Sequence, residues 1–250
     1  MDINEKVIGA IKALQQAQNI ETIFNIDLPA KVLQLDADAL EEFREEFWVE
    51  TAGRRSKFFR LNCANASVSD KAKLTWEYDN LPSVFSTFKN AVIDAETKAY
   101  GGQLPEGLCM TFRGGVNESL NGHLHVDDYR LPNTRIYLFR DETPSQCVSH
   151  EHTRDVFSDL IEQNIMGSAV LTKNLQSADR LIGGDLRDAF GLAHRQVLAS
   201  RQGQVLQERL LQQCEPLDAG GLYLMSGVTY HKKSPAAREG AIFQAAVAEL

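Results

Sequence analysis

The stretch "GHLHVDDYR", from Gly122 to Arg130, decides how the rest of the chain is interpreted. In an extended strand, residues i, i+2 and i+4 point to one face, so His123, His125 and Asp127 would converge on one side. Burying three polar groups together is costly unless something ties them to one another. A metal ion would do this, provided that another part of the chain supplies a further ligand. The alternative is a His–Asp ion pair on a solvated face.

Composition limits the classes of function. The chain has 250 residues, with 43% hydrophobic and 24% charged, which is typical of a globular protein of one large or two small domains. Its net charge of -8 disfavours general binding to nucleic acids or to anionic membranes. We therefore predict a small-molecule substrate, with no nucleic-acid and no membrane partner.

The cysteines and the N-terminal stretch indicate a cytoplasmic protein. No two cysteines form a C-x-x-C pair, which argues against a zinc site built from thiolates, and their wide spacing is typical of reduced thiols. The four are Cys63, Cys109, Cys147 and Cys214. The N-terminal residues carry acids and lack the apolar core of a signal peptide. No apolar run approaches the ~20 residues that cross a bilayer.

Helical patterns dominate the first hundred residues. Apolar spacing predicts amphipathic helices over 4–18, over 39–50 and from Pro82 to about Gly101. Short strands are predicted at "KVLQL", 31–35, and "SKFFRLN", 56–62.

After Pro105 the pattern changes to short strands separated by turn residues. They include "GLCMTFRGG", "HLHVDDYR", "TRIYLFRD", "GSAVLTKN", "GLYLMSG" and "AIFQAAVAEL". Residues 154–165 favour a helix, while the segment around Ser200 to Gly203 fits either a hairpin or a helix. We predict a single α+β domain over 1–250, with a helical and mixed part over 1–104. Residues 105–250 would form a β-barrel or jelly roll that carries a mixed insertion over 143–214.

The best candidate for the missing ligand lies about a hundred residues downstream. In "DAGGLYLMSGVTYHKKSPAAREGAIFQAAV", 218–247, a Gly-Gly turn leads into an apolar strand, a second turn and then His231. Arg238 follows seven residues later and precedes the last apolar strand. The pattern is thus His125-x-Asp127, a distal histidine and a late arginine.

This order resembles that of the Fe(II)- and 2-oxoglutarate-dependent oxygenases, over roughly 105–142 and 215–248. The resemblance implies a double-stranded β-helix in which His125, Asp127 and His231 bind Fe(II) and are the catalytic residues, and Arg238 binds 2-oxoglutarate. Two imidazoles and one carboxylate leave coordination positions open for the cosubstrate and dioxygen. A guanidinium can form a bidentate pair with the far carboxylate of 2-oxoglutarate. The implied enzyme is a dioxygenase that hydroxylates or otherwise oxidises a C–H bond.

Two other functions remain open on the sequence alone. A cupin-like dioxygenase or isomerase would keep the metal without 2-oxoglutarate, and Arg238 would then hold the substrate. A jelly-roll binding or sensing protein would use the histidines structurally. Anaerobic addition of Fe(II) and 2-oxoglutarate separates the three.

Other polar residues have less specific interpretations. His123 could replace His125 as a ligand, although the Asp127 spacing favours His125, and Asp128 is expected on the opposite face. We expect His150 and His152 at the surface before a helix. Lys232 and Lys233 are expected to be exposed, and either could replace Arg238.

Three arginines flank the motif, and one of them could meet a substrate carboxylate, although surface ion pairs explain most such residues. They are Arg113, Arg130 and Arg135. Four aromatic residues are expected in the core rather than around a substrate: Trp76, Tyr78, Phe112 and Tyr137.

Overall fold

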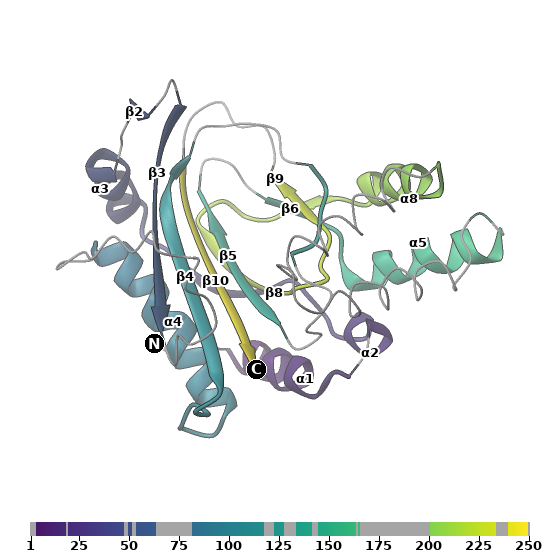
Figure 1. Cartoon of the computed structure of the whole chain (residues 1–250), viewed down its shortest axis with the longest axis horizontal. Coiled ribbons are helices and arrows are strands. Elements are labelled where there is room, and N and C mark those ends of the chain that lie inside the picture. Colours follow the sequence, from purple (N-terminus) through teal and green to yellow (C-terminus); the bar gives the residue numbers. More distant parts are fainter. Residues whose placement is uncertain are drawn as a thin grey trace, which may run out of the picture.

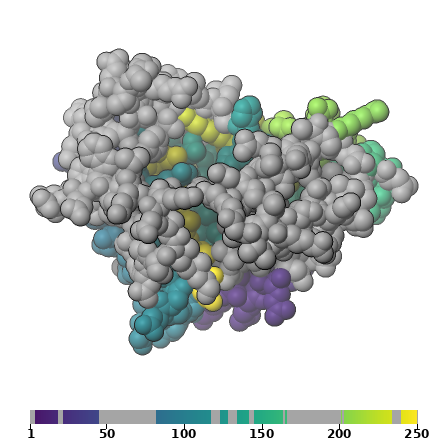
Figure 2. Space-filling view, in the orientation of Figure 1, coloured from purple at the N-terminus to yellow at the C-terminus, as the bar shows by residue number. Residues whose placement is uncertain are grey.

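Three of the N-terminal helices cover one face of a large antiparallel sheet in the computed structural model, and two later helices lie on the other side (Figure 1). The structure describes residues 4–18, 20–47, 50–51, 54–63, 82–117, 123–127, 134–141, 145–163, 165, 201–233 and 240–249. The N-terminal helices are α1 (Glu5–Gln16), α2 (Ile20–Phe24), α3 (Ala37–Phe47) and α4 (Ser83–Ala99). In the space-filling view, α4 and α1 (teal and purple) lie along the lower edge (Figure 2).

The ends of these helices follow from their capping residues. The Asn4 side chain accepts a hydrogen bond from the Lys6 amide at 2.9 Å and so caps α1. Pro82 precedes α4, where its fixed φ suits a helix start. Gly101 and Gly102 follow α4 with positive φ, which glycine adopts without strain. The predicted helices over 4–18 and from Pro82 are thereby confirmed.

The large sheet has seven strands in the order β1-β8-β5-β10-β4-β3-β2. Their bounds are β1 (Ala30–Gln34), β2 (Glu50–Thr51), β3 (Arg54–Cys63), β4 (Leu108–Asn117), β5 (Arg135–Arg140), β8 (Gly221–Ser226) and β10 (Gly240–Glu249). All the pairs are antiparallel. The predicted strands at 31–35 and 56–62 match these elements, as do "GLCMTFRGG", "TRIYLFRD", "GLYLMSG" and "AIFQAAVAEL". The prediction of a strand at "HLHVDDYR" is corrected: its described residues, 123–127, form a single β-bridge at His125 and no strand.

Strand alternation gives the sheet two chemically different faces. On the helix side, Tyr137, Phe139 and Phe243 are fully buried in one core with the apolar faces of α1, α3 and α4. On the other side, Ile136 and Leu138 pack against residues of a second sheet.

That second sheet has three strands in the order β7-β6-β9, with bounds β7 (Glu215–Pro216), β6 (Ser145–Cys147) and β9 (His231–Lys233). A buried cluster of Ile136, Leu138 and Met225 from the large sheet with Cys147 of β6 joins the two sheets. Helices α5 (His150–Glu162) and α8 (Arg201–Gln212) contact each other and bury Leu160, Leu206 and Leu210 in a further core. The chain is therefore a mixed structure of helices and antiparallel sheets.

The segment around Ser200 to Gly203, for which a hairpin and a helix were both open, belongs to the start of α8 from Arg201 on. Glycine costs about 1 kcal/mol inside a helix, but here the buried leucine stripe of α8 outweighs that cost. The predicted strand "GSAVLTKN" and the aromatic residues Trp76 and Tyr78 lie outside the described residues. Among the helices that the structure describes, none is long and apolar enough to cross a membrane.

Candidate metal centre

Two backbone hydrogen bonds place the two distant histidines opposite each other. The His125 amide donates to the His231 carbonyl at 3.0 Å, and the His231 amide donates to the His125 carbonyl at 2.9 Å. Directly opposed residues of an antiparallel pair point to the same face, and the two imidazole centroids lie 4.4 Å apart. Asp127 follows two residues after His125, and its amide donates to the Gly227 carbonyl at 2.9 Å. Leu124 and Val126 face the core that α5 and α8 share.

The ligand atoms of this triad face one point. His125 Nε2 and His231 Nε2 each lie 3.8 Å from an oxygen of the Asp127 carboxylate. One ligand atom from each of the three residues lies within 4.8 Å of the others. Atoms that share one ion at about 2.1 Å are roughly 3–4 Å apart, so small side-chain movements suffice for joint coordination. The triad could hold a metal ion.

Hydrogen bonds fix which ring nitrogens are available. His125 Nδ1 donates to the His123 carbonyl at 2.7 Å, and His231 Nδ1 donates to the Thr229 carbonyl at 2.9 Å. Because a carbonyl only accepts, each Nδ1 carries the proton and each Nε2 keeps its lone pair. Burial also lowers the pKa of His231, which favours the neutral ring that a metal requires.

A glutamine of the large sheet supports the carboxylate. Gln244 Nε2 donates to Asp127 Oδ2 at 2.9 Å. Arg113, opposite Gln244 in the register of β4 and β10, donates to the Gln244 Oε1. This second bond orients the amide, since its oxygen is occupied and its NH₂ group is turned towards Asp127. No sequence pattern pointed to Gln244, because it lies within an apolar strand far from the motif.

Gln244→Leu should therefore weaken metal binding without removing a ligand. The lost hydrogen bond frees Asp127 to rotate, and residues that support metal ligands typically contribute 10–100-fold in affinity. Titration of the purified protein with Fe(II) under anaerobic conditions measures this change. Gln146→Leu, a change of the same type in β6, serves as the control. Equal Fe(II) affinities in the two variants would contradict a supporting role for Gln244.

Arg140 lies at the end of β5, on the face of the sheet that carries Gln244. In the register, Arg140 is opposite Ile242, and Leu138 is opposite Gln244, so all four side chains share that face. The Arg140 Nε is buried and has no hydrogen-bond partner in the described part of the chain. Burial, together with the charge of Arg113, lowers the pKa of Arg140 to about 10, while Asp127 opposes that shift.

His150 corrects one of our expectations. It is 1% exposed rather than at the surface, because the start of α5 is enclosed by the α2 segment and the turn after β8. Its Nδ1 donates to the Ile23 carbonyl at 2.9 Å, and its Nε2 can accept from the hydroxyl of Thr229 at 3.0 Å or of Ser226 at 3.1 Å. The same Thr229 accepts from His231 through its carbonyl, so His150 supports the turn that holds a ligand.

The buried His150 should make stability depend on pH. Burial lowers its pKa to about 4 in the folded state, against about 6.5 in the unfolded chain. The unfolded state then binds more protons between pH 6.5 and 4, so stability is full above pH 6.5 and falls as the pH decreases. The titration of His150 alone should lower the free energy of unfolding by about 2 kcal/mol between pH 7 and pH 5. Urea unfolding of metal-free protein at both pH values should show this loss of stability, and His150→Gln should make the loss smaller. An equal loss in the two proteins would show that His150 does not cause it.

The remaining candidates divide as follows. His123 is exposed and is not part of the triad, although its carbonyl orients His125. Lys233 is buried and Lys232 is half-buried, so the expectation that both are exposed was wrong. Arg135 does not face the triad, because it is fully buried on the helix side with Glu96.

Phe112 and Tyr137 are fully buried in the core, as predicted. Asp128, Arg130 and Arg238 lie outside the described residues.

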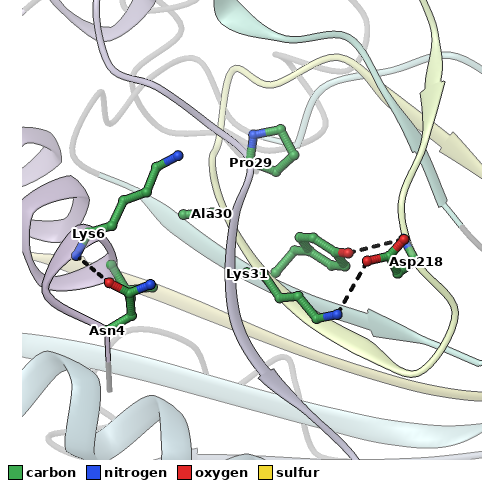
Figure 3. A pocket seen from close by; sticks show the side chains of 8 residues that line it. Asn4, Lys6, Pro29, Ala30, Lys31 and Asp218 are labelled. Atoms are coloured by element: carbon green, nitrogen blue, oxygen red, sulfur yellow. Dashed lines mark hydrogen bonds and ion pairs between the residues drawn. The ribbon is translucent and has the colours of Figure 1, made fainter. Parts of the chain in front are cut away.

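A pocket of about 330 Å³ lies elsewhere, between the start of α1, β1 and the turn before β8 (Figure 3). Lys31 Nζ and Asp218 Oδ2 form an ion pair across it at 3.3 Å, and Lys6 stands at its other side. Both lysines are exposed, which is typical of a solvated surface. No residue of the triad lines this pocket.

No protein-family model matches the chain, and no curated protein matches it significantly. Solved structures do resemble it. The non-heme alpha-ketoglutarate-dependent carbocyclase SnoK from nogalamycin biosynthesis has a TM-score of 0.45 and 10% identity, over 99% of this chain and 85% of SnoK. A Pseudomonas putida prolyl-4-hydroxylase has a TM-score of 0.41 and 9% identity, over 98% of this chain and 99% of the hydroxylase. HygX from Streptomyces hygroscopicus, with nickel and 2-oxoglutarate bound, has a TM-score of 0.42 and 10% identity, over 93% of this chain and 87% of HygX.

These structural neighbours are Fe(II)- and 2-oxoglutarate-dependent oxygenases. The function is therefore argued from the chemistry of the triad.

Proposed function

We propose that the chain is a mononuclear non-haem Fe(II) dioxygenase that couples decarboxylation of 2-oxoglutarate to hydroxylation or other oxidation of a small-molecule C–H bond. The observation that carries this proposal is the set of two imidazole Nε2 atoms and one carboxylate around a single point. Two histidines and one carboxylate with open positions are typical of non-haem Fe(II) oxygenases, whereas structural zinc sites close the fourth position with a protein ligand.

The strand order supports a double-stranded β-helix as the scaffold. From β4 to β10, the chain passes repeatedly between the seven-stranded and the three-stranded sheet. The segment 123–127 joins β9 through the His125 bridge, so both histidine ligands belong to the smaller sheet. The supporting Gln244 comes from the larger one. A site between two packed sheets is held by rigid backbone on both sides.

The residues of the site fit the proposed metal. Both Nε2 atoms are free to bind, and Gln244 leaves Asp127 Oδ1 open. When bound, Fe(II) with 2-oxoglutarate and dioxygen supplies the oxidising power for the C–H bond. The chain itself orients the ligands through the backbone carbonyls of His123 and Thr229.

For the cosubstrate, Arg238 remains our proposed partner of the far carboxylate, on the grounds of its position between the distal His231 and β10. Gly240 begins β10 two residues later, and β10 runs next to β5, which carries Arg140. A guanidinium would bind that carboxylate in a bidentate manner.

Arg238→Ala should raise the 2-oxoglutarate concentration needed for half-saturation about 30-fold or more. Removing one partner of a buried charge pair costs roughly 2–5 kcal/mol, and about 1.4 kcal/mol corresponds to a factor of ten. The half-saturating concentration for Arg238→Lys should lie between those of the unmodified protein and Arg238→Ala, since lysine keeps the charge but loses the planar guanidinium. Fe(II) affinity should stay nearly unchanged. A 2-oxoglutarate titration of Arg238→Ala that overlays the unmodified protein would remove Arg238 from the cosubstrate site.

The proposed function as a whole is tested by anaerobic spectroscopy. Fe(II) and 2-oxoglutarate together should give a weak visible charge-transfer band that neither gives alone. Admission of air should then release succinate. Iron binding without the band would indicate a metal enzyme that does not use 2-oxoglutarate, and neither signal would indicate a non-enzymatic protein. Succinate release across amino acids, other small metabolites and peptides would then locate the substrate.

A further inference from the structure

The large sheet presents two guanidinium groups towards the metal centre. Arg113 and Arg140 share the face of Gln244, as the registers of β4 with β10 and of β10 with β5 require. Arg113 is tied to Gln244 by a hydrogen bond, and Gln244 is tied in turn to Asp127. The charges of Arg113 and Asp127 both act on Arg140. The two arginines therefore lie beside the carboxylate ligand, not on the outer surface.

The charge of Arg140 has little to offset it. Among the described residues, Asp127 is the one carboxylate that acts on Arg140. A divalent ion would take up the charge of Asp127, and under the proposed function the ion and Arg238 would take up the two carboxylates of 2-oxoglutarate. Buried charge without a counter-charge is costly, so a further anion is favoured.

The Arg140 side chain shows where that anion would bind. Its Nε lies fully buried and without a hydrogen-bond partner in the described part of the chain. A buried donor that stays unsatisfied costs about 1–3 kcal/mol unless a ligand or water reaches it. The Nε edge of a guanidinium is one of the two that pair with an oxyanion in a bidentate manner.

We infer that Arg140, with Arg113 beside it, binds the anionic group of the substrate, and that the substrate is a small molecule with a carboxylate or phosphate. This inference rests on the proposed function, because it assigns the substrate class of the same metal centre. Arg140 then holds the substrate in place relative to the metal through its charged group. The earlier expectation that one flanking arginine meets a substrate carboxylate named Arg113, Arg130 and Arg135. The structure adds Arg140, which closes the same strand that Arg135 opens.

Matched pairs of probes test the inference on the full chain loaded with Fe(II) and 2-oxoglutarate without oxygen. Benzoate and inorganic phosphate are the anionic probes, and benzamide is the neutral counterpart of benzoate. The anions should perturb the charge-transfer band in a saturable manner, and benzamide should not. Arg140→Gln should weaken the effect of the anions about 30-fold or more, by the loss of a buried charge partner. Arg140→Lys should weaken it less. Arg154→Gln, which removes a half-exposed arginine of α5, should leave the effect unchanged.

The same titrations separate the possible sources of the anion. If Arg140→Gln weakens the binding of 2-oxoglutarate itself by tenfold or more while Arg238→Gln does not, Arg140 holds the cosubstrate. The inference about the substrate is then overturned. Equal effects of benzoate and benzamide would also overturn it. If the band never forms, the proposed function fails; the anions are then tested by their effect on the melting temperature of the Zn(II)-loaded protein. A stabilisation that depends on Arg140 would preserve the anion site, and none would overturn it as well.

Discussion

Replacing His231 with alanine should abolish both stable Fe(II) binding and turnover while leaving a folded protein. His125→Ala and Asp127→Ala should do the same, because each of the three supplies one of the ligand atoms that face a single point. Loss of a direct ligand should exceed the roughly 10–100-fold cost of losing a residue that only supports one. Metal content after dialysis, succinate release and circular dichroism measure binding, activity and folding.

Two other histidines serve as controls for this prediction. His123 lies two residues before His125 but is exposed, and His152 is partly exposed on α5. Alanine at either position should leave Fe(II) binding within about twofold, since surface changes rarely exceed 0.5 kcal/mol. If His123→Ala is inactive and His125→Ala is fully active, His123 and not His125 is the metal ligand. If no histidine matters, the metal hypothesis fails. If His231→Ala does not fold, His231→Gln tests the same prediction, because glutamine fills more of the buried volume.

The spacing of the ligand motif was enough to predict one half of the site. Alternation in "HLHVD" separates His125 and Asp127 from Leu124 and Val126, and the structure shows that division, with the two apolar residues in a buried core. The partner His231 lies about a hundred residues away. Only its order relative to the Gly-Gly turn and the apolar strand suggested that it returns to His125. The reciprocal backbone bonds that fix this pairing have no local sequence signal.

Residues that support the site were missed because their roles come from the packing of distant elements. Gln244 sits in an apolar strand, and nothing in its neighbours marks the hydrogen bond to Asp127. His150 has the local context of a surface helix start, with Ser149 as its N-cap. Its burial comes from the carbonyls of Ile23 and Ile26, more than a hundred residues earlier.

The other large effect is expected in the core, on the opposite face of the sheet. Glu96 and Arg135 are both fully buried, and Arg135 donates to the Glu96 carboxylate from Nε at 2.8 Å and from Nη2 at 2.8 Å. Tyr137 donates to the same carboxylate at 2.7 Å, and Arg135 also donates to the Tyr100 hydroxyl at 3.2 Å. Burial and the charge of Glu96 raise the pKa of Tyr137 well above its usual value, so its hydroxyl stays protonated as a donor. This network attaches α4 to β5.

Glu96→Ala should destabilise the protein by about 3–5 kcal/mol, because it removes the carboxylate that pairs with the buried Arg135 guanidinium. The double variant Glu96→Leu with Arg135→Met should lose much less, since replacing a buried ion pair by apolar side chains is often neutral. Asp218→Ala, which breaks the exposed pair with Lys31, should cost less than about 1 kcal/mol. Urea unfolding midpoints compare the three. If Glu96→Ala falls within 1 kcal/mol of the unmodified protein, water must reach Arg135 in the folded state. If the double variant is as unstable as Glu96→Ala, packing of the pair, and not its charge, would hold α4 on the sheet.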